Sequence, residues 1–309
     1  MKLKKPIFQG CATAIVTPFK DSKIDFETFC RLIDFQIEQG VSALVVLGTT
    51  GESPTVTYEE REELICVAVE KIAHRVPLIV GTGSNDTKRA VNLTQGAQKL
   101  GADAVLVVTP YYNKATENGL SAHFKAVASE SDLPIILYNI PSRTGVRISE
   151  RTLEALCDTQ SIVAVKEASG DIGELERKIA RFGNRFDFYS GCDELILPAY
   201  SLGGKGVISA VANVIPDKIS TLCALFEQKR IDEAIALARK ISPIISEMFA
   251  EVNPIPVKCA LSLMGMCENE LRLPLTPSTR AEQIRRVLAE LCRGAHSRQK
   301  KQADTVSAF

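Results

Sequence analysis

Short apolar runs rich in β-branched residues recur along the chain, and each is typical of a buried strand. Their starts lie roughly 20 to 34 residues apart, the length of a strand, a loop, a helix and a return loop. The eight runs are CATAIV near residue 11, ALVVL near 43, PLIVG near 77, AVLVV near 104, PIILY near 134, SIVAV near 161, FDFYS near 186 and GVIS near 206. The spacing predicts eight strands separated by helices.

Amphipathic patterns fill the intervals between these runs. The segments DFETFCRLIDFQIEQG (25–40) and TYEEREELICVAVEKIAH (57–74) repeat apolar residues at helical spacing, and Gly40 is a typical stop signal. Eight such units favour an α/β fold of the parallel (β/α)8 TIM barrel type over an open doubly wound sheet. An open sheet usually carries a glycine-rich phosphate turn after its first strand, whereas TPFKDSKID stands there in this chain.

The chain is predicted to have three parts. Residues 1–229 form the barrel, and residues 230–292 form a C-terminal helical extension, helical throughout, in which RIDEAIALARKISPIISEMFAE is the clearest pattern. Residues 293–309 are polar and aperiodic, which is typical of a disordered tail.

Composition and charge narrow the class of protein. The 309 residues include 37 Lys and Arg against 37 Asp and Glu, and this balance disfavours nucleic acid as the main partner. No apolar run approaches the roughly 18 residues of a membrane span, and Pro6, Gln9 and Gly10 break up a secretory signal. The nine cysteines are odd in number and lack a CxxC pair, so they are interpreted as small buried hydrophobes in a reducing cytoplasm. The three histidines lie far apart, so we expect no metal site.

A lysine, Lys166, comes immediately after the sixth strand, which places an ammonium at the carboxyl end of a buried strand. Active sites of (β/α)8 barrels lie at that end. Burial disfavours the charged form, so a neutral amine becomes available to attack a carbonyl carbon and form a Schiff base, without a metal or cofactor. The alternative is a structural ion pair between Lys166 and Glu167 or another carboxylate.

Other strand ends carry residues suited to the same chemistry. The loop GTTGESPT (48–55) can hold a small anion with its N–H groups and hydroxyls, or it is an ordinary helix cap. Tyr138 ends the fifth strand and can move protons, and Arg143 suits a carboxylate. The adjacent Tyr111 and Tyr112 are more often packing or interface residues. Their shared location at one face of the barrel favours a functional reading.

The motifs GTTGE, TPYYN, YNIPSRTG, VKEASGD and GVIS stand in an order that resembles the dihydrodipicolinate synthase and N-acetylneuraminate lyase family of class I aldolases. The resemblance covers residues 7–292. GTTGE with PSRTG is similar to the dihydrodipicolinate synthase branch, because the lyase branch generally lacks Arg143. This implies a lyase that condenses pyruvate with L-aspartate 4-semialdehyde on the route to diaminopimelate and lysine. It also implies a homotetramer of two tight dimers.

The resemblance implies individual roles for these residues. Lys166 would form the Schiff base with pyruvate, and Tyr138 would donate and accept protons. Thr49 and Tyr112 would complete a proton relay, with Tyr112 reaching across the tight dimer interface into the neighbour's site. The substrate-binding residues would be Thr50 for the pyruvate carboxylate, Ile208 through its backbone, and Arg143 for the carboxylate of the semialdehyde.

Feedback-inhibited members of the family bind lysine at the tight dimer interface. The corresponding positions here are Ser53, Pro54, Tyr58, Arg61, Asn85, Arg89 and Tyr111. Arg89 stands where sensitive enzymes carry a glutamate, and Tyr58 and Arg61 replace histidines. Because a cation at position 89 would repel the inhibitor's ammonium, we expect weak or absent inhibition by lysine.

Two other functions compete with this prediction. A sialic acid lyase or 2-keto-3-deoxy sugar acid aldolase would keep the pyruvate Schiff base and change the aldehyde, and Arg143 argues against it. A catalytically silent barrel that binds a keto acid as a regulator or scaffold would not need the complete set of relay residues.

Overall fold

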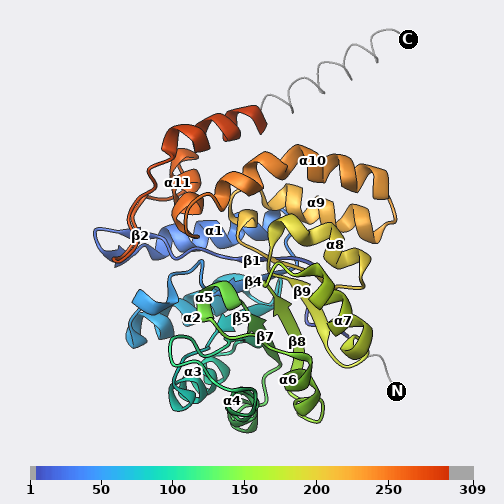
Figure 1. The fold of residues 1–309 in the computed structure, drawn as a ribbon. Coiled ribbons are helices and arrows are strands. Elements are labelled where there is room, and N and C mark those ends of the chain that lie inside the picture. Colours follow the sequence, from blue (N-terminus) through green and yellow to red (C-terminus); the bar gives the residue numbers. More distant parts are fainter. Residues whose placement is uncertain (1–4, 292–309) are drawn as a thin grey trace.

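A computed structural model describes residues 5–291. Eight parallel strands form a closed barrel in the order β1, β10, β9, β8, β7, β6, β5, β4 (Figure 1). The strands are β1 (Gly10–Ala14), β4 (Ala43–Val46), β5 (Leu78–Gly81), β6 (Ala104–Val108), β7 (Ile135–Asn139), β8 (Ile162–Glu167), β9 (Asp187–Ser190) and β10 (Gly206–Ser209). Each strand coincides with one of the predicted apolar runs, so the predicted barrel is confirmed. A short hairpin, β2 (Phe19–Lys20) with β3 (Lys23–Ile24), was not predicted.

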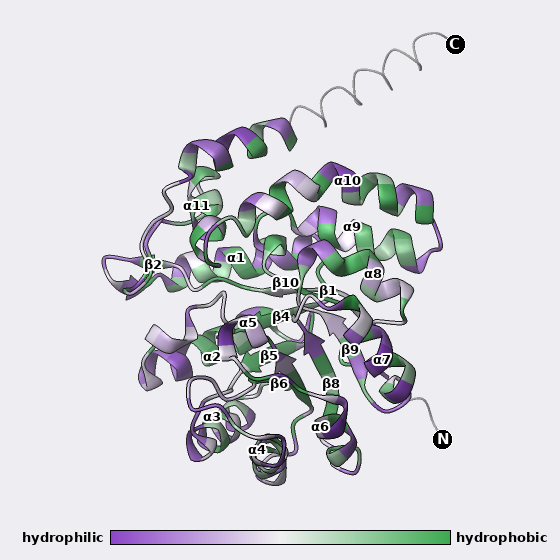
Figure 2. Cartoon of the chain, in the orientation of Figure 1, coloured by the Kyte–Doolittle hydropathy of each residue, from purple (hydrophilic) through white to green (hydrophobic). Residues whose placement is uncertain are grey.

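Helices surround the barrel, with hydrophilic outward faces on α3, α6 and α7 (Figure 2). They are α1 (Phe26–Glu38), α2 (Tyr58–Ile72), α3 (Thr87–Lys99), α4 (Glu117–Ser129), α5 (Pro141–Thr144), α6 (Glu150–Ala155), α7 (Ile172–Phe182), α8 (Ile196–Ser201) and α9 (Pro216–Glu227), with 3-10 turns η1 (Ser53–Thr55), η2 (Asp193–Leu195) and η3 (Val211–Asn213). The two helices described above as sequence patterns begin one residue after the starts of those segments. Asp25 caps α1, and Thr57 forms a capping box with Glu60 at α2.

Many of the side chains inside the barrel are small. The inward-facing cluster includes five alanines on the strands, namely Ala12, Ala14, Ala43, Ala104 and Ala164. At the amino end, Phe8 stacks on Tyr189 with ring centroids 4.2 Å apart, and the Tyr189 hydroxyl donates to the Phe8 carbonyl at 2.8 Å. These two side chains therefore fill the amino end of the barrel. A substrate-binding cavity can form only at the carboxyl end.

The C-terminal segment contains α10 (Ile231–Met248), α11 (Ile255–Leu263) and helical residues 281–291. The prediction of helix throughout 230–292 is wrong over residues 249–254 and 264–280, which form turns, bends and irregular chain. Pro274 and Pro277 lack the N–H that a helix needs, and Gly265 has a left-handed φ of 72°. The boundary at residue 229 stays a prediction, and the predicted disordered tail lies outside the described residues.

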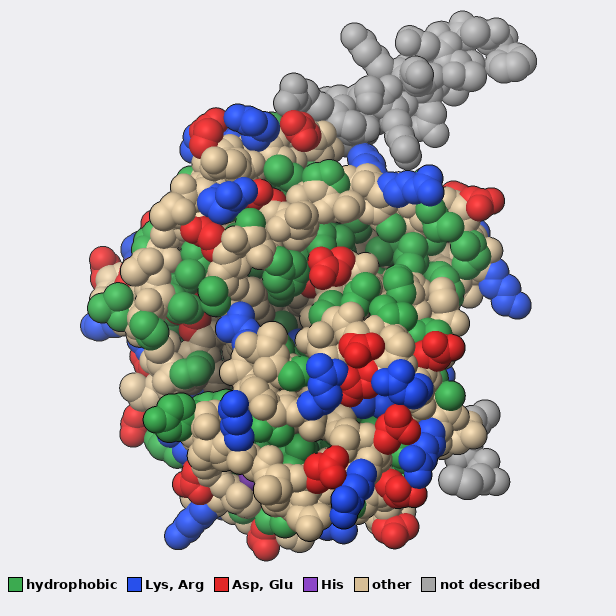
Figure 3. Space-filling view, in the orientation of Figure 1, with side chains coloured by type: hydrophobic (Ala, Val, Ile, Leu, Met, Phe, Trp, Pro, Cys, Tyr) green, Lys and Arg blue, Asp and Glu red, His purple; other side chains and the backbone are tan. Residues whose placement is uncertain are grey.

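The C-terminal helix α10 packs beside α9 (Figure 1). Hydrophobic side chains gather on the surface over α8, α9 and α10 (Figure 3). Among the described helices, none is long and apolar enough to cross a bilayer.

The eight described cysteines are all free. The expectation that they are buried holds for Cys11, Cys223 and Cys259. It is wrong for Cys66, which is exposed on α2, and four others are half-buried.

Candidate active site

Lys166 and Tyr138 lie side by side on neighbouring strands. The register of β7 and β8 pairs Tyr138 with Lys166, and both side chains are buried, with 5% and 6% of their surface exposed. The Lys166 Nζ atom stands 4.3 Å from the centroid of the Tyr138 ring. Lys166 belongs to the strand itself and does not follow it, a small correction to the predicted placement. The Lys166 amine is thus shielded from solvent and lies against the Tyr138 ring.

The adjacent Glu167 does not pair with Lys166. Successive side chains of a strand point to opposite faces, and the Glu167 carboxylate accepts from Asn139 Nδ2 at 2.7 and 2.9 Å and from Lys178 Nζ at 2.8 Å. Within residues 5–291, Lys166 makes no ion pair at all. The alternative of a Lys166–Glu167 pair is therefore wrong, and the amine is left for chemistry.

Glu167 and Asn139 clamp the two strands together just beyond the Tyr138–Lys166 pair. Asn139 follows Tyr138 on β7, and Glu167 follows Lys166 on β8, so their hydrogen bonds fix the register that brings amine and phenol together. Lys178 on α7 neutralises Glu167 from outside the barrel and also pairs with Glu174 at 2.6 Å. Burial lowers the pKa of Lys178, and Glu167 opposes that shift.

Gly191 makes room for the lysine side chain. A Cβ atom at this position would lie 2.9 Å from Lys166 Cε and 2.7 Å from Ala168 Cβ, closer than real contacts allow. Only glycine therefore fits after β9. No local pattern in the sequence marks this residue, because the constraint comes from a strand distant in sequence.

A cavity of about 660 Å³ opens at the carboxyl end of the barrel. It contains six of the predicted site residues, namely Lys166, Tyr138, Thr49, Thr50, Ile208 and Arg143. It also contains residues that sequence reasoning missed, namely Gly191, Cys192, Asp193 and residues 249–253. No group of three or more metal-ligating side chains occurs in the described part of the chain.

Asn253, in the loop between α10 and α11, joins two of the predicted substrate-binding residues. Its Nδ2 donates to Thr50 Oγ1 at 3.0 Å, and its carbonyl accepts from Arg143 Nη2 at 3.0 Å. Its Oδ1 atom is buried with no hydrogen-bond partner in the described chain. The C-terminal segment thus contributes to the site, a role that its helical sequence pattern does not predict.

Asp193 places a second ionisable group in the cavity. Burial raises its pKa to about 6, while hydrogen bonds from Ser209 and the Ala210 N–H and the charge of Lys166 oppose the shift. It lies at the start of η2, three residues after the end of β9.

Glu52 holds the loop that carries Thr49 and Thr50 against the C-terminal segment. This residue adopts a left-handed φ of 51°, and its carboxylate forms a fully buried ion pair with Lys258 of α11 at 2.5 Å. It also accepts from the Arg272 N–H at 3.1 Å. The carboxyl-terminal third of the chain therefore fixes the loop in the site.

A model of the dihydrodipicolinate synthetase family matches residues 7–291. The chain belongs to this family. The 4-hydroxy-tetrahydrodipicolinate synthase of Alkaliphilus oremlandii is 49% identical to it over 271 residues, which cover 88% of this chain and 93% of that protein. The predicted family is confirmed.

Solved structures agree with the fold. The crystal structure of dihydrodipicolinate synthase from Thermotoga maritima matches with a TM-score of 0.91 at 44% identity, covering 93% of this chain and 99% of that one. The structure of the enzyme from Cyanidioschyzon merolae with lysine bound matches with a TM-score of 0.90 at 38% identity, covering 93% and 99%.

The predicted relay is not closed within one chain. Tyr112 is 92% exposed and adopts a left-handed φ of 70°. Thr49 lines the cavity beside Tyr138. Among the described residues, neither Thr49 nor Tyr112 forms a hydrogen bond with Tyr138.

Most of the predicted effector positions line a second cavity of about 310 Å³ that adjoins the first. These are Ser53, Pro54, Arg61, Arg89 and Tyr111, and the cavity shares Thr49, Tyr138 and Arg143 with the candidate active site. Tyr58 lies at the rim, where its ring contacts the Arg89 guanidinium at 5.1 Å. Asn85 is outside the lining, and its carbonyl accepts from Asn113 at 2.9 Å.

Proposed function

We propose that this protein catalyses the condensation of pyruvate with L-aspartate 4-semialdehyde, the reaction of a 4-hydroxy-tetrahydrodipicolinate synthase in diaminopimelate and lysine biosynthesis. The observation that carries the proposal is the buried amine of Lys166 in contact with the Tyr138 ring, 4.3 Å from its centroid. Family membership and relatives that are named for this reaction support it over a sugar acid aldolase. The proposed location is the cytoplasm.

The chemistry begins at Lys166. Its neutral amine attacks the keto carbon of pyruvate to give a carbinolamine. The carbinolamine hydroxyl takes a proton from Tyr138 and leaves as water, which gives an iminium and the Tyr138 phenolate. The iminium draws electrons from the adjacent methyl carbon, which loses a proton to the Tyr138 oxygen and becomes an enamine carbon. That carbon attacks the aldehyde of the second substrate, and the new alkoxide takes a proton from Tyr138. The amino group of the semialdehyde then displaces Lys166 from the iminium carbon and closes the ring.

Three residues hold the substrates in this proposal. The Thr50 hydroxyl and the backbone at Ile208 bind the pyruvate carboxylate in the main cavity, which both residues line. Arg143 binds the carboxylate of the semialdehyde at the mouth, where its guanidinium is exposed and donates to the Asn253 carbonyl.

The proton relay is proposed to be completed in an oligomer. Tyr112 is too exposed to take part in the relay of its own chain. We therefore place it in the active site of a neighbouring subunit, where that subunit's Thr49 would link it to that subunit's Tyr138. A homotetramer of two tight dimers, as the family resemblance implies, supplies that neighbour.

Borohydride reduction in the presence of pyruvate tests the proposal. We expect a stable adduct on the peptide that contains Lys166, detected by mass spectrometry. The Lys166→Met variant should show no adduct, and Lys205→Met, which changes a lysine outside the cavity, should react like the wild type. Absence of an adduct, or an adduct on another lysine, would refute the assigned nucleophile. Turnover of sugar aldehydes in preference to aspartate semialdehyde would refute the assigned substrate.

A further inference from the structure

Two buried polar side chains, Asn139 and Glu167, directly follow the reactive pair along β7 and β8. Asn139 Nδ2 donates to both carboxylate oxygens of Glu167, at 2.7 and 2.9 Å. The Oδ1 atom of the same asparagine accepts from the Ile148 N–H at 2.9 Å. Because the loop that carries Arg143 spans residues 140–147, this second bond ties the two ends of that loop together.

A series of ion pairs extends these contacts into a closed ring. Glu167 pairs with Lys178 of α7, which pairs in turn with Glu174 on the same helix. Glu174 then pairs with Arg147, whose chain neighbour is Ile148. The contacts thus return to the end of the loop from which they started. We call this set the polar ring, and its members are Asn139, Glu167, Lys178, Glu174 and Arg147.

The polar ring supports two parts of the site from outside it. Although none of its members lines the main cavity, strand pairing places Asn139 opposite Glu167 exactly one residue beyond Tyr138 and Lys166. A slip of one residue between the strands would turn side chains to the other face of the sheet, and the hydrogen bonds of the polar ring oppose that slip. The same ring closes the base of the loop that carries Arg143.

We propose that Asn139 and Glu167 are positioning residues for both halves of the proposed condensation, on which this inference rests. They set the distance between the Lys166 amine and the Tyr138 phenol, and they hold Arg143 where the semialdehyde binds. A buried polar network in which each member has its partner is rigid, so the loss of one member loosens the others. A displacement of about 1 Å between reacting groups lowers a rate on the order of a hundredfold.

Asn139→Ala in the full-length protein tests the two halves separately. The rate of Schiff-base formation with pyruvate alone, followed by borohydride quenching at intervals and mass spectrometry, reports only on the amine and the phenol. It should fall about a hundredfold. The steady-state KM for aspartate semialdehyde reports on the Arg143 loop, and it should rise about tenfold because the contact with the substrate carboxylate is loosened.

A pair of double variants isolates the hydrogen bond from the buried charges. Glu167→Gln with Lys178→Met keeps an acceptor for Asn139, whereas Glu167→Ala with Lys178→Met removes it. The first should form the Schiff base within about threefold of the wild-type rate, because the hydrogen bond between the strands persists. The second should be slower than the first by a factor of about thirty or more.

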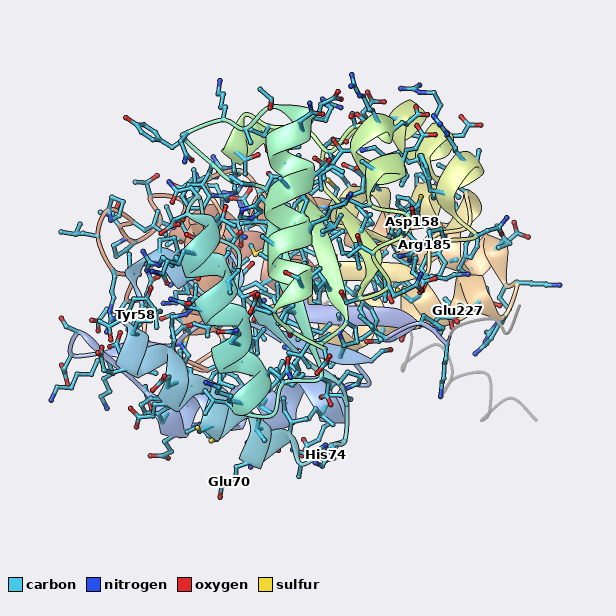
Figure 4. The ribbon with its side chains drawn as sticks, turned by 90° about the horizontal axis from the view of Figure 1, so that it is seen from below. Tyr58, Glu70, His74, Asp158, Arg185 and Glu227 are labelled. Carbon is cyan, nitrogen blue, oxygen red and sulfur yellow. The ribbon has the colours of Figure 1, made fainter. Side chains whose placement is uncertain are left out.

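Arg185→Met is the matched control, because Arg185 holds the opposite, amino end of β8. Its guanidinium donates to the carbonyls of Cys157, Thr159 and Ile162 at 2.6, 2.6 and 2.9 Å. Figure 4 shows Arg185 beside Asp158, in the loop that precedes β8. This variant should lower the stability in urea unfolding and leave both kinetic readouts within about twofold of the wild type.

The proposal is overturned by an unchanged Schiff-base rate or an unchanged KM in Asn139→Ala, or by equal losses in Arg185→Met. If Asn139→Ala does not fold, the two double variants decide, and equal rates in them would overturn it. A wild type that forms no adduct on Lys166 would refute the proposed function and this inference together. A wild type that reacts, with variants that react equally fast, would refute only the positioning role.

Discussion

Replacing Lys178 by methionine should destabilise the protein strongly. The Lys178 ammonium is fully buried and pairs with Glu167 at 2.8 Å and Glu174 at 2.6 Å. Methionine fills a similar volume but leaves the Glu167 carboxylate, 3% exposed, without a counter-charge. Asn139 still donates to Glu167, and Arg147 still pairs with Glu174, so these contacts limit the loss.

The size of the expected loss of stability follows from these contacts. Removing one partner of a buried pair costs about 3–5 kcal/mol, and the remaining hydrogen bonds place this case near the lower limit, ~3 kcal/mol. At ~2 °C per kcal/mol for a large domain, the Tm should fall by about 6 °C.

Urea unfolding followed by circular dichroism measures the effect. Lys71→Met, which removes the ammonium from a half-buried surface pair with Asp34, is the matched control and should cost less than ~1 kcal/mol. The double variant Glu167→Gln with Lys178→Met removes both charges and should be more stable than the sum of the single losses predicts. The reasoning fails if Lys178→Met costs no more than the control, or if the double variant shows no recovery.

Three further predictions concern the site. Asn253→Ala should raise the KM for aspartate semialdehyde about tenfold in steady-state assays, because Thr50 and Arg143 lose their common support; an unchanged KM would contradict this role. Lysine should inhibit only weakly, and Arg89→Glu should increase its potency in dose–response assays; strong inhibition of the wild type at sub-millimolar lysine would refute the charge argument. The pKa of Asp193 is about 6 in the folded protein, above its ordinary value of 3.8, so the folded state holds this proton more tightly than the unfolded chain does. The free energy of unfolding should therefore be higher at low pH and fall as the pH rises from 4 to 6. At 1.36 kcal/mol per pKa unit, the free energy of unfolding of the wild type should fall by up to ~3 kcal/mol relative to that of Asp193→Asn over this interval. Urea unfolding at several pH values measures this difference. If the free energies of unfolding of the two proteins vary with pH in parallel, the assignment to Asp193 is wrong.

The sequence was sufficient for the barrel and for the reactive pair. Each strand is a local apolar run, and the carboxyl-end position of Lys166 and Tyr138 follows directly from where the runs end. Parallel pairing then brings those two ends together. Local pattern and fold class were enough for this inference.

Other parts of the site depend on contacts that no local pattern reports. Asn253 meets Thr50 across 203 positions of the chain, and Lys258 meets Glu52 across a similar span. Gly191 matters only because Lys166 passes beside it. Proline-rich residues 264–280 were misread because the prediction extended a helical composition past its breakers.

The ion pair between Glu52 and Lys258 predicts what happens when the chain is cut between the barrel and its helical extension. A fragment ending at residue 229 would retain the nucleophile and its phenol, yet it would expose a lone glutamate in the substrate loop and lack Asn253. Cutting there should yield two pieces that are inactive apart and that recover activity only when they reassociate, so the barrel and its helical extension form one cooperative catalytic unit.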